Sequence, residues 1–197
     1  MRKKIIITGG LGYIGTELCK LYSGVSWHHQ IIVIDSRFIS ERVNQLRNWN
    51  MEFVQGDILD RELIKNYCED ADIIHHLAGV TDVPRTKSEA SKLQDEKIVE
   101  VGEKGTQNIL DVISDKCKVI FPSTHVVYEG IENVKKNILE SEETNPVLSY
   151  SSSKAINEEQ LKKSGKNYVI LRLGSVYGYS SDSTRIDIMP NLFSKIA

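Results

Sequence analysis

Short apolar runs recur along this chain, and between them the apolar positions fall at helical spacing. The first run, residues 5–7, consists of three isoleucines. It is too short for a helix and is β-branched throughout, which predicts a buried strand. Comparable runs predict further strands at residues 31–34, 52–55, 72–77, 118–121 and 168–173. The intervening patterns predict helices after residue 15 and at residues 41–47, 61–67, 88–113 and 150–163.

The regular alternation of strands and helices predicts an α/β fold, a doubly wound parallel sheet of the Rossmann type. Right-handed crossovers place helices on both faces of such a sheet, and ligands bind at the carboxyl ends of the strands. Asp60 is expected to cap the amino end of the helix at residues 61–67. The polar segment 129–146 is expected to form a loop over the ligand site.

Composition and charge narrow the class of protein. The chain has 197 residues and a formal net charge of −2, which suits one domain with its own core and gives no sign of a nucleic-acid partner. The basic residues 2–4 precede only three isoleucines, too short an apolar stretch for a signal peptide or a membrane span. Cys19, Cys68 and Cys117 are scattered and odd in number, which is typical of reduced, mostly buried thiols in a cytoplasmic protein.

A glycine-rich turn follows the first predicted strand. Gly9, Gly12 and Gly15 form the pattern G-x-x-G-x-x-G between that strand and a helix. Glycine takes positive φ and lets a ligand approach the backbone closely. The first amides of the helix, near Tyr13 and Ile14, then face a site that favours negative charge, such as a pyrophosphate. A strand-to-helix turn without a ligand is the alternative interpretation.

An acidic residue ends the second predicted strand. Asp35 lies about 20 residues beyond the last motif glycine, where a dinucleotide site places the carboxylate that binds the adenosine ribose. An ordinary aspartate at the end of a strand is the alternative. An acid at this position repels the 2′-phosphate of NADP and favours NAD, although the nearby Arg37 softens that preference.

The fourth predicted strand runs into the small residues Ala78 and Gly79. Small side chains at the carboxyl end of a strand let a cofactor pass close by. His75 and His76 within this strand raise the question of a metal site. Neighbours on a strand point to opposite faces, and no third ligand has suitable spacing, so no metal site is predicted.

Several short motifs occur in one order along the chain. They are Thr8-Gly9-x-x-Gly12-x-x-Gly15, Gly56-Asp57, His76-Leu77-Ala78-Gly79, Ser123-Thr124, Tyr150-x-x-x-Lys154 and Leu171-Arg172-x-x-x-x-Tyr177-Gly178. Each motif alone is weak, but the ordered set resembles the extended short-chain dehydrogenase/reductases. Within them it is similar to the NAD-dependent epimerase/dehydratase family, which acts on nucleotide-activated sugars. The resemblance covers essentially the whole chain.

This resemblance implies an NAD cofactor and a role for each matching residue. The pyrophosphate would be surrounded by Gly9, Gly12 and Gly15 and by the amides near Tyr13 and Ile14. Asp35 would hold the adenosine ribose, and Asp57 and Ile58 would meet the adenine. The path of the cofactor would be lined by Leu77, Ala78 and Gly79. The implied catalytic set is Thr124, Tyr150 and Lys154, and the last two would also contact the cofactor.

The chemistry of the catalytic set is consistent with these residue types. Tyrosine, with a pKa near 10, is a poor base at neutral pH, and a nearby ammonium lowers that pKa. Tyr150 and Lys154 stand at i, i+4 on one helix face, although such a pair is also common on surface helices. Lys154 would also bind the nicotinamide ribose, and Thr124 would orient the reacting hydroxyl. Ser123 could take this role instead, but the family pattern selects Thr124.

The position after Thr124 bears on the type of reaction. Dehydratases of the family usually carry an acidic pair there, and this chain has His125 and Val126. The resemblance therefore disfavours a 4,6-dehydratase and favours an epimerase or a reductase. In the epimerase, the reading we prefer, the sugar hydroxyl is oxidised, the keto sugar rotates and the hydride returns to its other face. A reductase or 4,6-dehydratase, and a protein that binds NAD without turnover, remain as alternatives.

The chain also departs from the family pattern. Gly102 and Ser175 stand where relatives often have asparagine. Relatives continue well beyond this length, so we expect a cofactor domain at residues 1–178 and the start of a truncated or missing substrate-binding lobe at residues 179–197. Members of the family often pair through the helices that correspond to residues 92–113 and 150–163, which implies a homodimer.

Overall fold

The computed structural model describes residues 2–81, 92–133, 135–180, 190–191 and 194 of the chain. Within these residues, strands and helices alternate as the sequence predicts. The strands are β1 (Lys4–Thr8), β2 (Gln30–Asp35), β3 (Glu52–Gln55), β4 (Ile73–His76), β5 (Lys118–Thr124) and β6 (Asn167–Leu173). The helices are α1 (Tyr13–Tyr22), α2 (Ser40–Asn48), α3 (Arg61–Cys68), α4 (Lys92–Val112) and α5 (Ser149–Lys163), with a 3₁₀ turn at His125–Tyr128.

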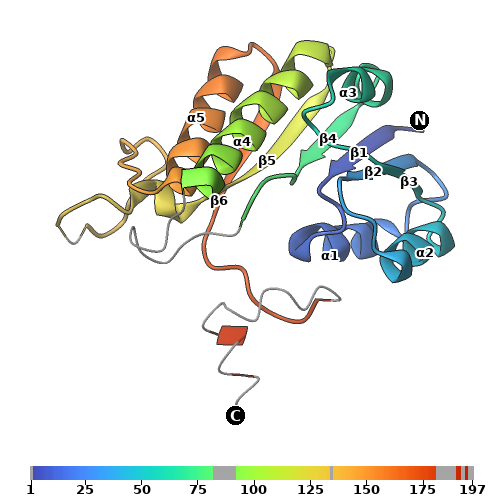
Figure 1. The fold of residues 1–197 in the computed structure, drawn as a ribbon, viewed down its shortest axis with the longest axis horizontal. Coiled ribbons are helices and arrows are strands. Elements are labelled where there is room, and N and C mark those ends of the chain that lie inside the picture. The colour runs from blue at the N-terminus through green and yellow to red at the C-terminus, as the bar shows by residue number, and fades with distance from the viewer. Residues whose placement is uncertain (1, 82–91, 134, 181–189, 192–193, 195–197) are drawn as a thin grey trace.

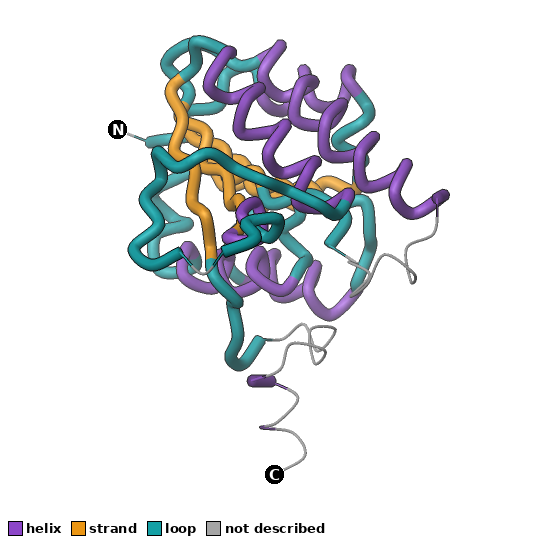
Figure 2. Tube along the Cα trace, turned by 90° about the vertical axis from the view of Figure 1, so that its left-hand side faces the viewer, coloured by secondary structure: helices purple, strands orange, loops and turns teal. Residues whose placement is uncertain are grey.

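The six strands form one parallel sheet in the order β3-β2-β1-β4-β5-β6. Helices α1 and α2 cover one face, and α3, α4 and α5 cover the other (Figure 1). Figure 2 shows the strands as a central layer between the two layers of helices. The order reverses between β1 and β4, so the carboxyl ends of these strands are where such a fold binds its ligands.

Each face of the sheet has its own apolar core. Ile6, Ile74 and Phe121 project from the strands toward α3, α4 and α5. On the other face, Ile5, Ile7 and residues of β2 pack against α1 and α2. The isoleucine runs are buried on both sides because each successive side chain meets one of the two helical layers.

The predicted helix cap and histidine directions are confirmed. The Asp60 carboxylate accepts a hydrogen bond from the amide of Leu63 in the first turn of α3. His75 bonds Tyr22 of α1, whereas its neighbour His76 lies on the opposite face. Among the residues that the structure describes, no three His, Cys, Asp or Glu side chains gather as a metal site would require.

Strand β5 is longer than the apolar run at residues 118–121 suggests, because it continues to Thr124. Pro122 interrupts the sequence pattern but not the strand. The pairing of β5 with β4 ends at Ile120, so Pro122 is paired only with β6, on one side of the strand. Loss of its N–H is therefore tolerated. The expected helical residues 88–91 lie outside the described residues.

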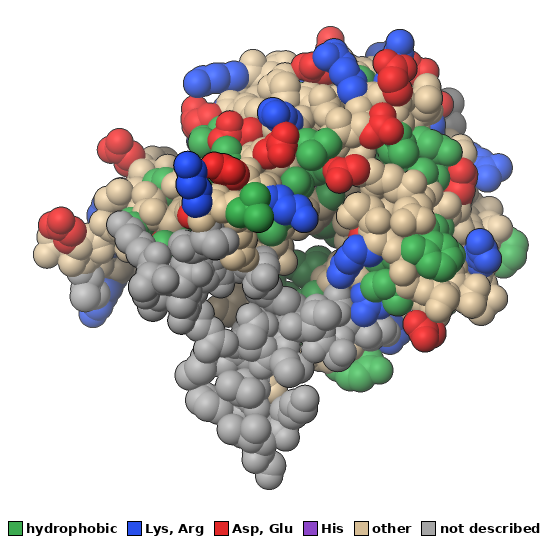
Figure 3. All heavy atoms as spheres, viewed as in Figure 1, with side chains coloured by type: hydrophobic (Ala, Val, Ile, Leu, Met, Phe, Trp, Pro, Cys, Tyr) green, Lys and Arg blue, Asp and Glu red, His purple; other side chains and the backbone are tan. Residues whose placement is uncertain are grey.

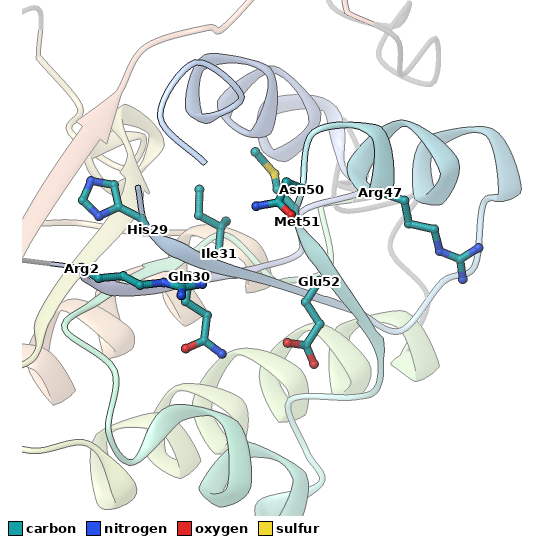
Figure 4. Close-up of a pocket in the computed structure, with 8 residues that line it drawn as sticks. All are labelled: Arg2, His29, Gln30, Ile31, Arg47, Asn50, Met51 and Glu52. Atoms are coloured by element: carbon teal, nitrogen blue, oxygen red, sulfur yellow. The ribbon is translucent and has the colours of Figure 1, made fainter. Parts of the chain in front are cut away.

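Two surface features lie away from the edge of the sheet that the carboxyl ends of the strands form. A cavity of about 330 Å³ opens at the amino ends of β1, β2 and β3, where Arg2, Gln30 and Glu52 line it (Figure 4). Figure 3 shows Lys, Arg, Asp and Glu side chains interspersed over the helices at the top of the molecule. No helix in the described part of the chain has the length and apolar character needed to span a bilayer.

Candidate functional site

The glycine-rich turn leaves β1 by way of Gly9, whose φ is +68°. A Cβ on Gly9 would lie 2.7 Å from both the Cα and the N of Ala78, at the end of β4. The amide of Gly9 donates to the carbonyl of Ile34 at 2.7 Å. Gly9 therefore joins the ends of three adjacent strands, and only glycine satisfies both the backbone angle and the available space.

Gly12 and Gly15 shape the start of α1. A Cβ on Gly15 would lie 2.5 Å from the Gly9 carbonyl oxygen, so α1 packs directly on the turn. Gly12 is the N-cap residue and supplies no side-chain acceptor to the helix. The first amides of α1, at Tyr13 and Ile14, consequently open toward the cradle of glycine backbone, as a bound pyrophosphate requires.

Asp35 lies at the end of β2 with its side chain only 4% exposed. Its Oδ2 accepts from the amide of Leu11 at 2.9 Å, and its Oδ1 accepts from the amide and Nε of Arg37 at 3.0 and 3.3 Å. Arg42 of α2 donates to the carbonyl of Leu11. The ribose candidate is thus bonded to the glycine-rich turn and to Arg37, while Arg42 bonds the same turn.

The residues expected near adenine differ in what they expose. Asp57 is exposed and accepts from the amide of Leu59 at 3.0 Å. Ile58 is buried, with its side chain against Gly105 of α4 and its carbonyl accepting from Asn108 at 3.0 Å. Gly79 follows β4, and a Cβ added there meets nothing within 4 Å, which leaves room along the expected cofactor path.

Leu77 and Ala78 are held by a buried chain of polar groups. The amide of Leu77 donates to the carbonyl of Thr8, and that of Ala78 donates to the Thr8 hydroxyl at 3.2 Å. The same hydroxyl lies 2.9 Å from Nδ1 of His76, whose Nε2 lies 3.0 Å from the hydroxyl of Thr106. Burial, together with the charge of Lys154, lowers the pKa of His76 to about 3. A neutral imidazole with its proton on Nε2 gives each of these contacts a donor.

The end of β5 presents two adjacent hydroxyls in different surroundings. Ser123 donates to Glu158 of α5 at 2.6 Å. The Thr124 Oγ1 accepts from the amide of Val126 at 3.3 Å, which leaves its proton to donate elsewhere. These contacts favour Thr124 over Ser123 as the group that meets a substrate. His125 is exposed, with Nδ1 3.2 Å from the carbonyl of Leu173.

Lys154 lies beside Tyr150 at the end of β5. Its Nζ is 6.0 Å from the centre of the Tyr150 ring, and it donates to the Pro122 carbonyl at 2.9 Å. It also lies 4.4 Å from the centre of the Phe121 ring. Burial lowers the pKa of Lys154 to about 8, while the charge of Glu158 acts to raise it.

A buried ion pair stands behind Lys154. Arg172 of β6 donates through Nη2 to Glu158 at 2.6 Å, and the two side chains are 12% and 2% exposed. Burial alone would raise the pKa of Glu158, but hydrogen bonds from Arg172 and Ser123 outweigh it and lower the pKa. This pair ties α5 to β6, and the bond from Ser123 to Glu158 ties α5 to β5 next to Thr124.

Two further contacts set the position of α5. The carboxylate of Glu129 accepts from the amides of Val147 and Leu148 and from the hydroxyl of Ser151. It thereby holds the amino end of the helix that carries Tyr150. On the neighbouring helix, the hydroxyl of Ser153 lies where a Cβ on residue 102 would stand, and Gly102 leaves that space free. The departure from asparagine at residue 102 thus has a packing explanation.

The sequence of this chain is similar to those of known proteins. The NAD dependent epimerase/dehydratase family matches residues 5–197. The chain belongs to this family. Among curated relatives, the dTDP-D-glucose 4,6-dehydratase of Dictyostelium discoideum is 29% identical, over 89% of this chain and 44% of its own length. A putative UDP-glucose 4-epimerase of Methanocaldococcus jannaschii is 30% identical, over 90% of this chain and 57% of its own length.

Solved structures of epimerases share the fold. UDP-N-acetylglucosamine 4-epimerase from Methanobrevibacter ruminantium is 27% identical over 99% of this chain and 63% of its own, with a TM-score of 0.77. The Brucella ovis UDP-glucose 4-epimerase, crystallised with NAD, is 27% identical over 90% of this chain and 54% of its own, with a TM-score of 0.73. The chain spans about half the length of the curated relatives.

Some residues of the site were not predicted from the sequence. Glu158 could have been found from its position four residues after Lys154, since this spacing places both on one helix face. Glu129 and Thr106 carry no comparable local signal. Their contacts with α5 and with His76 depend on chain segments that meet only in the folded protein.

Proposed function

We propose that this chain is the cofactor-binding part of an NAD-dependent nucleotide-sugar epimerase. The main support is the position of the site residues. The glycine cradle and Thr124 lie at the carboxyl ends of parallel strands, and Tyr150 and Lys154 lie on the helix beside them. Membership of the epimerase/dehydratase family and the similar epimerase structures support the same reading.

The residues present fit the adenosine diphosphate end of NAD. The cradle at Gly9, Gly12 and Gly15 leaves backbone where a Cβ would otherwise stand, and the amides of α1 open beside it. Asp35 would hold the adenosine ribose, Asp57 and Ile58 would face the adenine, and Leu77–Gly79 would line the remaining path. When bound, NAD supplies the acceptor of a hydride from the sugar carbon.

The catalytic work then falls to three side chains. Tyr150 would take the proton of the sugar hydroxyl, and the Lys154 ammonium would favour the phenolate form that this requires. Thr124 would donate its remaining proton to the reacting oxygen and hold it in line. Lys154 would also bind the nicotinamide ribose, because its bond to the Pro122 carbonyl uses only one of its three N–H donors.

The test combines binding with product analysis. The purified protein is denatured and any released dinucleotide is identified by mass spectrometry, after which a panel of nucleotide sugars is incubated with it. An epimerase yields an isomer of unchanged mass. Tyr150→Phe should lower the rate by about 10²–10⁴-fold, while Tyr168→Phe, at the opposite end of the sheet, should not. Failure to bind NAD, even when it is added, would exclude the proposal.

A 4,6-dehydratase is the second candidate, because one of the curated relatives carries that activity. His125 and Val126 follow Thr124 in place of the acidic pair usual in such enzymes, which favours epimerisation. The same assay separates the candidates, since a dehydratase product is lighter by one water and a reductase consumes reduced cofactor. Binding of NAD with no conversion would indicate a binding protein.

We further propose that residues 1–178 form the cofactor domain, and that residues 179–197 begin the lobe that completes the sugar site. Exposed Val169 and Leu171 on the edge strand β6 favour cover by additional chain. A cytoplasmic homodimer through α4 and α5 is supported by exposed apolar side chains on these helices, Val99 and Ile156 among them. Light scattering of the purified protein measures this assembly.

A further inference from the structure

Backbone hydrogen bonds close the base of the segment that leads from Thr124 to the helix of Tyr150. The amide of Asn145 donates to the carbonyl of Val127 at 2.8 Å, and the carbonyl of Asn145 accepts from the amide of Gly130 at 2.8 Å. The side-chain amide of Asn145 also donates to the Gly130 carbonyl at 2.8 Å. The residues that follow β5 are therefore bonded directly to those that precede α5.

Glu129 adds a second link, which reaches the helix itself. Its Oε1 accepts from the amides of Val147 and Leu148 at 2.8 and 2.7 Å, and from the hydroxyl of Ser151. Ser151 is 1% exposed, and its Oγ accepts in turn from the amide of Leu148 at 3.1 Å. One carboxylate oxygen thus gathers three donors at the start of α5.

The start of α5 has no side-chain acceptor of its own at the N-cap. That residue is Leu148, whose side chain makes no capping hydrogen bond. The carboxylate of Glu129 stands at this end instead, where the helix dipole favours a negative charge. Glu129 directly follows the 3₁₀ turn that begins after Thr124, and Tyr150 is the second residue of α5. A short bonded path therefore leads from Thr124 through Glu129 to Tyr150.

The distance between a base and the proton it takes limits the rate of proton transfer. A general base works within about 2.6–3.2 Å of its partner, and a displacement of about 1 Å can cost about 10²-fold in rate. We propose that Glu129 is a positioning residue, which fixes the phenol of Tyr150 relative to the hydroxyl of Thr124. The consequence for turnover rests on the proposed function, whereas the position of Tyr150 can be measured without turnover.

NMR of the purified protein, with ¹³C at the Cζ of its eight tyrosines, measures that position. Tyr150→Phe assigns the Tyr150 signal by its loss. Glu129→Ala should shift or broaden this signal, because the start of α5 loses its acceptor. Glu129→Gln keeps an oxygen for the amides of Val147 and Leu148 and should leave the signal near that of the parent. Glu132→Ala removes the same charge at an exposed position of the same segment and should not move it.

Turnover of the nucleotide sugar that the parent converts gives a second readout. Glu129→Ala should lower kcat by about 10–10²-fold and leave KM and the affinity for NAD⁺ nearly unchanged, because the glycine cradle lies on other elements. Glu129→Gln should restore most of the rate. A raised KM at unchanged kcat would overturn the inference in favour of a substrate contact. Equal losses in the Ala and Gln variants would overturn it in favour of an effect of charge alone.

The two proposals can fail separately. An unchanged Tyr150 signal in Glu129→Ala would overturn the positioning role and leave the proposed function intact. If the parent converts no nucleotide sugar, the proposed function fails, and the Tyr150 signal alone decides whether Glu129 positions the ring. Urea unfolding checks that each variant is folded. Should Glu129→Ala not fold, Glu129→Asp takes its place, since its side chain is one methylene too short for the same three donors.

Discussion

Gly9 and Ala78 approach so closely that a Cβ on Gly9 would stand 2.7 Å from the backbone of Ala78. The turn that follows β1 and the residues that follow β4 are therefore one packed unit. Backbone atoms on both sides cannot turn aside as a side chain can. The φ of +68° at Gly9 adds a second requirement for glycine.

Substitution of Gly9 by alanine should consequently damage both stability and dinucleotide binding. The left-handed backbone alone costs about 1–2 kcal/mol for an alanine, and the contact with Ala78 adds to it. Urea unfolding measures the first effect and calorimetry with NAD⁺ the second. Gly24→Ala is the matched control, since a Cβ there meets nothing within 4 Å. Unchanged NAD⁺ affinity in Gly9→Ala would contradict this account of the cradle.

His76 should make the protein less stable as the solution becomes acidic. Burial lowers its folded pKa to about 3, whereas a histidine in the unfolded chain titrates near 6.5. Between these values the unfolded state binds one more proton, so the free energy of unfolding falls by up to about 1.4 kcal/mol per pH unit. The contribution is fully present above pH 6.5 and is lost toward pH 3.

Urea unfolding across this pH window checks the prediction. His76→Gln should reduce stability at pH 7 by about 1–3 kcal/mol, because the hydroxyls of Thr8 and Thr106 lose a buried partner. It should also flatten the decline below pH 6.5. The exposed His28→Gln variant should leave the slope as in the parent, and an equal slope in His76→Gln would show that another group causes the decline.

The adjacent residues Glu158 and Glu159 should differ sharply when each is replaced by alanine. Glu158 is 2% exposed and paired with Arg172, whereas Glu159 is 52% exposed and pairs with lysines of its own helix. Removal of Glu158 leaves a guanidinium without its buried partner, which costs about 3–5 kcal/mol. Glu159→Ala should cost less than about 1 kcal/mol. Thermal or urea unfolding distinguishes them, and similar losses would mean that the Arg172 pair is not the cause.

The sequence predicted the local features of this fold well. The β-branched runs at β1 and β2, the cap at Asp60 and the opposite directions of His75 and His76 follow from spacing and side-chain chemistry within a few residues. The end of β5 was missed because Pro122 breaks the apolar run, and its strand conformation depends on pairing with β6 alone.

Contacts between distant segments could not be predicted in this way. The bond between His76 and Thr106 joins residues 30 positions apart, and that between Asp35 and Leu11 spans 24. Neither partner is marked by local periodicity. For the same reason, the sequence showed Arg37 as a nearby cation but not its bond to Asp35.

Lys154 should lose its proton within a readily accessible pH range. Burial lowers its pKa to about 8, even though the charge of Glu158 opposes the shift. Because the folded pKa lies below the value of about 10.4 in an unfolded chain, the unfolded state binds more protons between these values, and the free energy of unfolding rises as pH increases from 8 toward 10.4. NMR of carbon-labelled methyl groups on the lysines should show one resonance with a midpoint near 8. Lys154→Arg identifies it, since that resonance disappears.

The charge state of Lys154 should also govern Tyr150. Above the lysine midpoint the ammonium no longer favours the phenolate, so catalysis that uses Tyr150 as base should level off or decline near pH 8 instead of rising toward pH 10. Glu158→Gln removes the opposing charge and should move the NMR midpoint below 8. A rate that continues to rise through pH 9, with the lysine resonance titrating near 8, would separate Lys154 from the activation of Tyr150.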